Sequence, residues 1–114
     1  MADKTIRQIV REIQVECRDC DVPPNRAAEM LTTLTAVMGS IGVERRAADL
    51  AYDSKYLELF KEHEAANRAK LFANVTPEYQ RKREAADLHE EAKQLVITLR
   101  QVLRTAGDEM RLTR

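Results

Sequence analysis

The side chains of this chain that could do chemistry are two cysteines and two histidines. Cys17 and Cys20 form the sequence Cys-Arg-Asp-Cys, a spacing shared by redox motifs and by one half of a zinc site. A redox pair normally follows a β-strand, and tetrahedral zinc needs four ligands, whereas His63 and His89 are distant in sequence. We therefore predict no metal and no cofactor, with one buried thiol and one exposed thiol. A zinc ion bridging two subunits, each giving two thiolates, is the alternative.

Catalytic motifs of the common kinds are missing from the sequence. It contains no Gly-rich phosphate loop, no Gly-x-Ser-x-Gly and no His-Glu-x-x-His. Di-iron bundles need a Glu three residues before a His, and Phe60 and Ala86 occupy those positions. Arg83 and His89 resemble the Arg and His pair of helical ribonucleases, but six residues of helix are about 600° of rotation, which separates their faces. We predict a protein that is not an enzyme, with His89 on the surface.

A group of basic and aromatic residues is the candidate binding surface for a partner or for nucleic acid. It consists of Arg68, Lys70, Phe72, Tyr79, Arg81, Lys82 and Arg83. The last three lie in the first turns of a predicted helix, where the positive end of the dipole favours acidic residues. Basic side chains interleaved with aromatic rings can hold phosphates and stack on bases. We favour a solvated helix face, because Glu78 and Glu84 offer ionic partners, and keep nucleic-acid binding as the alternative.

Composition favours long helices over a large core. A chain of 114 residues is the usual size of one domain, and much of its 44% hydrophobic content is alanine, with no Trp. A charged content of 33% with so little aromatic volume is typical of helices stabilised by pairing and self-association. Because 19 basic residues balance 19 acidic ones, no global field draws the chain to nucleic acid or a membrane. No apolar run reaches the ~20 residues of a membrane span and no secretion signal is visible, so we expect a cytoplasmic protein.

Helical periodicity predicts a first helix over residues 3–17, with Asp3 as its cap, and a second over residues 24–73. Pro23-Pro24 separates the two, since proline suits the first turn of a helix. Gly39 and Gly42 each weaken a helix by roughly 1 kcal/mol, but strong helix formers follow, so we predict one continuous helix, straight or bent. In its second half, apolar residues such as Leu50 and Leu57 wrap around more than one face. More than one partner could therefore contact it there.

The last predicted helix, over residues 77–106, carries the strongest pattern in the sequence. Thr76 can cap it, Pro77 is its first residue, and Gly107 is expected to end it. Apolar residues spaced alternately by three and four form a seam that another helix must cover. The helix-pairing core of this seam consists of Leu88, Ala92, Leu95, Leu99 and Val102. The short connection at residues 74–76 predicts antiparallel neighbours.

Together these features predict an all-α fold. We expect an elongated antiparallel helical hairpin or bundle with coiled-coil-like packing, a short N-terminal helix, a single domain over residues 1–114 and association into a homo-oligomer.

Two segments and the leucine heptads also carry a resemblance. They read Asp49-Leu-Ala-Tyr-Asp-Ser-Lys-Tyr-Leu57 and Thr76-Pro-Glu-Tyr-Gln-Arg-Lys-Arg83, and the heptads continue to Arg104. Over about residues 44–106 this pattern resembles small uncharacterised helical proteins of tailed bacteriophages, from the gene region of replication and recombination. The resemblance implies an accessory protein of the host cytoplasm that binds another protein or single-stranded DNA, with no catalytic residues. The N-terminal part, with its Cys-x-x-Cys and double proline, departs from that pattern.

Three functions remain open at the level of sequence. The first is a non-enzymatic helical interaction protein, a phage-encoded accessory that binds a replication, recombination or host protein. The second is a direct binder of single-stranded nucleic acid through the basic tip of the hairpin. The third is a structural subunit of a larger assembly. The expected partners are the chain itself and another protein, with no membrane.

Overall fold

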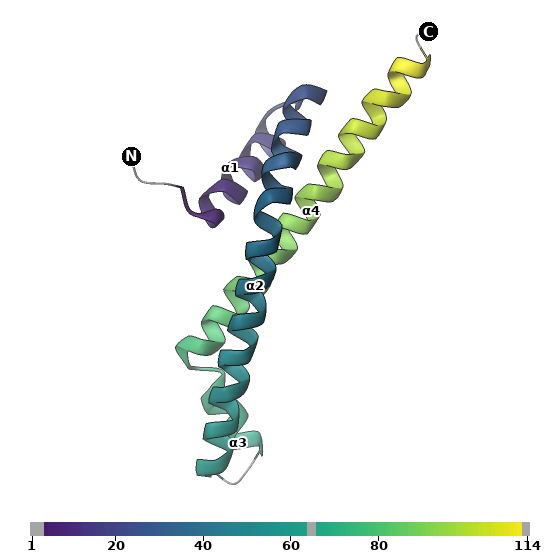
Figure 1. Ribbon diagram of the computed structural model, residues 1–114. Helices are drawn as coiled ribbons and strands as arrows, with labels where there is room; N and C mark the ends of the chain where they lie inside the picture. The colour runs from purple at the N-terminus through teal and green to yellow at the C-terminus, as the bar shows by residue number, and fades with distance from the viewer. Residues whose placement is uncertain (1–3, 64–65, 113–114) are drawn as a thin grey trace. The chain divides into compact units, whose positions relative to one another are not determined.

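The computed structural model describes residues 4–63 and 66–112, and those residues form four helices (Figure 1). They are α1 (Ile6–Asp19), α2 (Pro24–His63), α3 (Ala66–Ala73) and α4 (Pro77–Leu112). No strand occurs in these ranges, and helices α2 and α4 pack against each other. The predicted all-α class is therefore confirmed.

Two compact units make up the chain. Unit 1 comprises Met1–Gly39 with Glu90–Arg114, and unit 2 comprises Ser40–His89. Helices α2 and α4 each contribute one part to unit 1 and another to unit 2. The expectation of a single domain therefore stays a prediction.

Helix α1 is held at its start by a reciprocal cap. The amide of Gln8 donates to Thr5 Oγ1 at 3.1 Å, and the amide of Thr5 donates to Gln8 Oε1 at 2.9 Å. Two otherwise unsatisfied donors are thus paired. The predicted cap, Asp3, lies outside the described residues, and Thr5 is the N-cap. The helix also ends two residues later than predicted, at Asp19.

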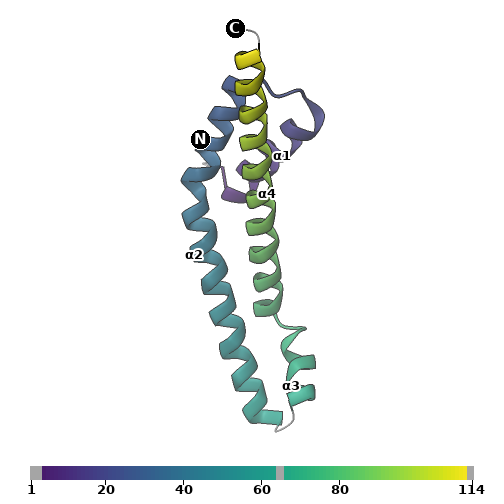
Figure 2. The ribbon, with the colours of Figure 1, turned by 90° about the vertical axis from the view of Figure 1, so that its right-hand side faces the viewer.

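Helix α2 begins at Pro24 and is continuous through the two glycines, as predicted, but it ends at His63 instead of residue 73. Helix α3 lies beside the C-terminal part of α2 (Figure 2). The rings of His63 and Phe72 stack with centroids 4.6 Å apart, and Tyr52 Oη donates to Asn74 Oδ1 at 2.7 Å. Through these contacts α3 packs back along α2. The helix predicted over residues 24–73 therefore corresponds to two helices, α2 and α3, before the predicted turn at residues 74–76.

Helix α4 begins at Pro77 as predicted, with Thr76 as its cap. Thr76 Oγ1 accepts from the Tyr79 amide at 3.3 Å and donates to the Ala73 carbonyl at 2.6 Å, which joins the end of α3 to the start of α4. The predicted end at residue 106 is wrong, since the helix continues to Leu112. Gly107 lacks the positive φ of a helix-ending glycine, so it weakens the helix without stopping it.

The two units have cores of different character. Buried side chains of unit 1 come from α1, α2 and α4, and those of unit 2 are four alanines and one isoleucine. The unit 1 core consists of Val10, Ile13, Ala27, Met30, Leu34, Ala92, Leu95 and Leu99, and the unit 2 core of Ile41, Ala48, Ala69, Ala73 and Ala85. Small residues let helix backbones approach closely, so the larger apolar side chains of unit 2 lie nearer its surface.

Candidate functional site

Every aromatic side chain of the protein lies in unit 2. The chain has three Tyr and two Phe, and Tyr52, Tyr56 and Phe60 follow one another at intervals of four residues on α2. This spacing places them on one face of the helix. The ring centroids of Tyr52 and Tyr56 are 6.4 Å apart, and those of Tyr56 and Phe60 are 6.5 Å apart. Tyr79 of α4 joins this row, with its centroid 5.7 Å from that of Tyr52.

Tyr52 is the centre of this cluster. It is half-buried, and its hydroxyl is fixed by the hydrogen bond to Asn74. Burial raises the pKa of Tyr52, and the neighbouring Tyr79, Tyr56 and Asp53 raise it further. The phenol is thus a neutral hydrogen-bond donor that positions the turn between α3 and α4.

Each member of the basic triplet at the start of α4 contacts another side chain of unit 2. Arg81 forms a two-pronged ion pair with Glu44, at 2.8 Å and 3.1 Å. Lys82 Nζ lies 4.3 Å from the centroid of the Tyr52 ring, and the Arg83 guanidinium carbon lies 5.9 Å from that of Tyr79. Both distances suit cation–π attraction. Side chains of α2 and of α4 itself therefore offset the unfavourable interaction of these three positive charges with the positive end of the α4 dipole.

The hydrogen bonds of Arg81 shift both partners of its ion pair. They lower the pKa of Glu44 and raise the pKa of Arg81. Since these two side chains are exposed, salt screens the pair, and its contribution to stability is small. Arg81 is occupied by Glu44, whereas Arg68 and Lys70 are exposed on α3. The structure thus brings Tyr79, Lys82 and Arg83 to one cluster and directs Arg81 elsewhere.

Apolar side chains at the end of α3 form an exposed group that the sequence pattern predicts only in part. Leu71 is 72% exposed, Phe72 is 46% exposed and Val75 is 79% exposed. We call these three residues the α3 patch. Only Phe72 was among the predicted residues. The run Leu71-Phe72-Ala73 next to a turn is the sequence feature that indicates this exposed group. Apolar side chains beside a surface turn have few neighbouring elements that could bury them.

Residues of the predicted helix-pairing core lie on the inner side of α4. Ala92, Leu95 and Leu99 are buried within unit 1, and Leu88 and Val102 are half-buried. The seam is thus largely covered by the chain's own helices, and little of it is left for a second copy.

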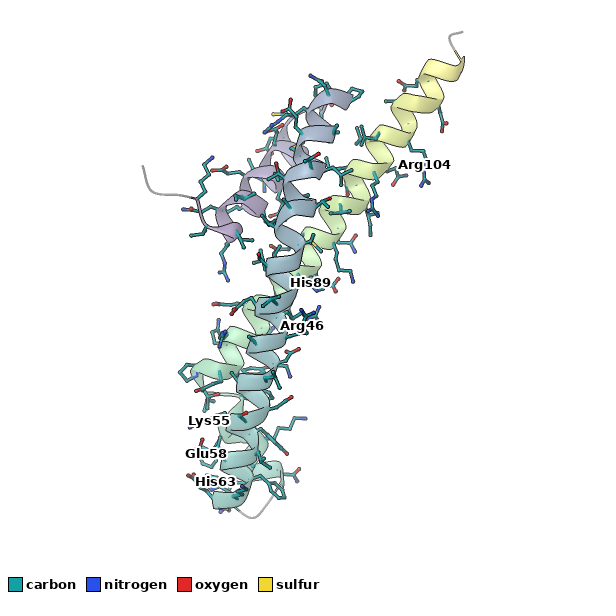
Figure 3. All side chains as sticks on the ribbon, viewed as in Figure 1. Arg46, Lys55, Glu58, His63, His89 and Arg104 are labelled. Carbon is teal, nitrogen blue, oxygen red and sulfur yellow. The ribbon has the colours of Figure 1, made fainter. Side chains whose placement is uncertain are left out.

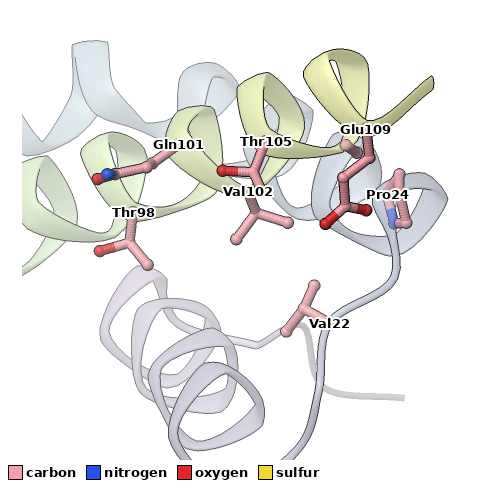
Figure 4. Close-up of a pocket in the computed structure, with 8 residues that line it drawn as sticks. Val22, Pro24, Thr98, Gln101, Val102, Thr105 and Glu109 are labelled. Carbon is pink, nitrogen blue, oxygen red and sulfur yellow. The ribbon is translucent and has the colours of Figure 1, made fainter. Parts of the chain in front are cut away.

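Unit 1 contains a surface cavity of about 420 Å³ beside α4 (Figure 4). Its lining consists of Val22, Pro24, Thr98, Gln101, Val102, Thr105, Ala106 and Glu109. The polar members are exposed side chains. A specific small-molecule site normally has convergent polar groups in an apolar, enclosed pocket, and this cavity offers exposed ones.

The residues considered for catalysis are not brought together. Arg83 contacts Tyr79, whereas His89 is half-buried, with its Nδ1 2.7 Å from a terminal nitrogen of Arg45. His89 is thus only partly exposed at the surface, because it also contacts Arg45 of α2. Since guanidinium nitrogens only donate, Nδ1 accepts, and the ring proton lies on Nε2.

Both cysteines are free thiols, Cys17 half-buried and Cys20 exposed. Burial raises the pKa of the Cys17 thiol, and the charge of Glu16 adds to this effect. In the described part of the chain, no three His, Cys, Asp or Glu residues are grouped so that they could hold a metal ion. A zinc ion shared between two subunits stays a prediction.

Within residues 4–63 and 66–112, no helix combines the length and apolar character that a membrane crossing requires. No protein-family model, curated protein or solved structure matches this chain.

Proposed function

We propose that this protein is a non-enzymatic interaction protein that binds another protein through the α3 patch. The proposal rests on the distribution of exposed large apolar side chains among the described residues. Seven of these nine side chains lie in unit 2, so we expect a partner to bind that unit. The seven are Val43, Leu50, Leu57, Phe60, Leu71, Phe72 and Val75. Groups of exposed apolar side chains are common at protein–protein interfaces.

Rigidity supports the α3 patch as the contact surface. Phe72 stacks on His63, Asn74 accepts from Tyr52, and Thr76 caps the following helix. These contacts fix the backbone on both sides of Val75. A partner would therefore bind a preformed surface and lose less free energy to ordering.

Charge indicates the chemistry of the partner. Arg68 and Lys70 are exposed on the same short helix as Leu71 and Phe72. An apolar surface bordered by acidic side chains would complement them. On the resemblance described above, we propose that the partner belongs to DNA replication or recombination, or to the host of a phage.

Site-specific photocrosslinking tests this function. A photoreactive amino acid at Leu71 or Val75 should give one discrete adduct in cells that express the chain, identified by mass spectrometry. The same amino acid at Thr35, an exposed position of unit 1, is the matched control. Leu71→Asp on a chain labelled at Val75 should abolish the adduct. Adducts of equal yield at Thr35, or none at either patch position, would contradict the proposal.

Binding of single-stranded nucleic acid is the second candidate, and the positions of Lys82 and Arg83 over tyrosine rings favour it. Fluorescence anisotropy with a labelled oligonucleotide should then show affinity that falls steeply with salt. Neutralising both residues to Gln should lower the slope of log K against log salt by about 0.7 for each lost phosphate contact. Lys93→Gln with Arg100→Gln, two exposed unit 1 positions, is the control. Unchanged salt dependence would exclude this surface.

A further inference from the structure

A second apolar surface runs along α2 within unit 2. Val43, Leu50 and Leu57 recur every seven residues and are 58%, 67% and 55% exposed. We call these three residues the α2 stripe. Seven residues of α-helix bring the side chain back to within about 20°, so the three form one line.

The α2 stripe faces away from the rest of unit 2. Ala48 and Tyr52 lie two residues before and after Leu50, about 200° around the helix. Ala48 is buried, and Tyr52 contacts both Asn74 and Tyr79. The covered side of α2 is thus opposite to the stripe. A narrow apolar line of this kind is covered in other proteins by a second helix.

Two charges beside the stripe indicate what covers it. Arg46 precedes Leu50 by four residues, and Asp53 follows it by three. Both are exposed, and neither forms an ion pair with another described residue. Figure 3 shows Arg46 on α2. At 100° per residue, both lie about 40° to 60° from Leu50 on the same side of the stripe.

When two copies of α2 pair through the stripe, the charges of Arg46 and Asp53 are complementary only if the helices are antiparallel. In an antiparallel pair centred on Leu50, the two-fold axis is perpendicular to the helices and keeps a flanking charge on the same side of the seam. Arg46 of one copy then lies within about 1.5 Å, along the helix axis, of Asp53 of the second copy. The axis generates this ion pair twice. In a parallel pair, Arg46 and Asp53 lie on opposite sides and cannot meet.

We propose that a second copy of this chain covers the α2 stripe in an antiparallel dimer. Leu50 packs on its own symmetry mate, and Val43 packs on Leu57 of the second copy. The buried seam of α4 is not required for this contact. The dimer is also independent of the α3 patch, because the stripe lies on the side of α2 opposite to its contacts with Phe72 and Asn74.

The interface is short, so we expect a dissociation constant between about 1 μM and 1 mM, as in transient complexes. Sedimentation equilibrium across this range should show a monomer–dimer equilibrium. Arg46→Asp and Asp53→Arg should each raise the dissociation constant about tenfold, because two attractions become two repulsions. The double variant should restore it. Arg104→Asp, an exposed unit 1 position, is the control and should leave it unchanged. A monomer at about 1 mM, or no recovery in the double variant, overturns the proposal.

Disulfide trapping tests the orientation, in a chain with Cys17→Ser and Cys20→Ser. Leu50→Cys should form a covalent dimer on mild oxidation. Val43→Cys and Leu57→Cys should each stay monomeric alone and form a mixed dimer together. In the proposed pair, identical residues at either position are about 21 Å apart along the axis, far beyond the reach of a disulfide. Covalent homodimers of Val43→Cys would indicate a parallel pair and refute this arrangement.

Discussion

Replacing Leu99 by alanine tests whether the seam of α4 stabilises unit 1. Leu99 is 0% exposed and lies among the buried residues of α1 and α2 in that unit. Truncation removes three carbon atoms from the core and leaves a cavity that the neighbouring helices can close only in part. Leu→Ala changes at such sites cost about 3 to 5 kcal/mol, and we expect about 3 kcal/mol here.

A matched control is available on the same helix. Ile97 lies two residues before Leu99 and is 52% exposed. Ile97→Ala loses part of its apolar contact but gains helix propensity, so its cost should stay below about 1 kcal/mol. The difference between the two variants isolates the effect of burial.

Urea unfolding followed by far-ultraviolet circular dichroism measures both values, with all chains at one protein concentration. Since small proteins are stable by about 5 to 15 kcal/mol in total, a loss of 3 kcal/mol gives a clear shift of the midpoint. Equal costs for Leu99→Ala and Ile97→Ala would refute the assignment of this seam to the core.

Three further predictions follow from local contacts. Thr5→Ala removes the reciprocal cap of α1 and should cost about 1 kcal/mol in the same unfolding assay, whereas Thr5→Ser should retain stability. Because Arg81 lowers the pKa of Glu44 from its ordinary value of 4.5, their pair stabilises the fold above that pH and is lost as the pH falls below it. Arg81→Gln should therefore lower the urea midpoint near neutral pH and leave it unchanged in acid; an equal loss at both would contradict this origin. Burial raises the pKa of Cys17, so Cys20→Ser should remove the fast phase of reaction with a disulfide reagent and Cys17→Ser should leave it.

Local rules determine much of the secondary structure from the sequence. Pro24 and Pro77 begin helices because each occupies a position where the missing amide costs nothing, and Thr76 caps because its hydroxyl reaches the first turn. The spacing of Leu95 and Leu99 places both on the same face of α4 whatever they pack against. These features depend on neighbours within one or two turns.

The tertiary structure decides the rest. Helix α2 ends at His63 and α3 turns back because Phe72 and Asn74 find partners on α2, and no local pattern encodes contacts between residues that distant. Packing also decides which leucines of these helices belong to the core and which are exposed. Leu99 is buried and Leu50 is exposed, although both belong to regular seven-residue patterns. Periodicity fixes the face on which a side chain lies, whereas burial depends on which face a second helix covers.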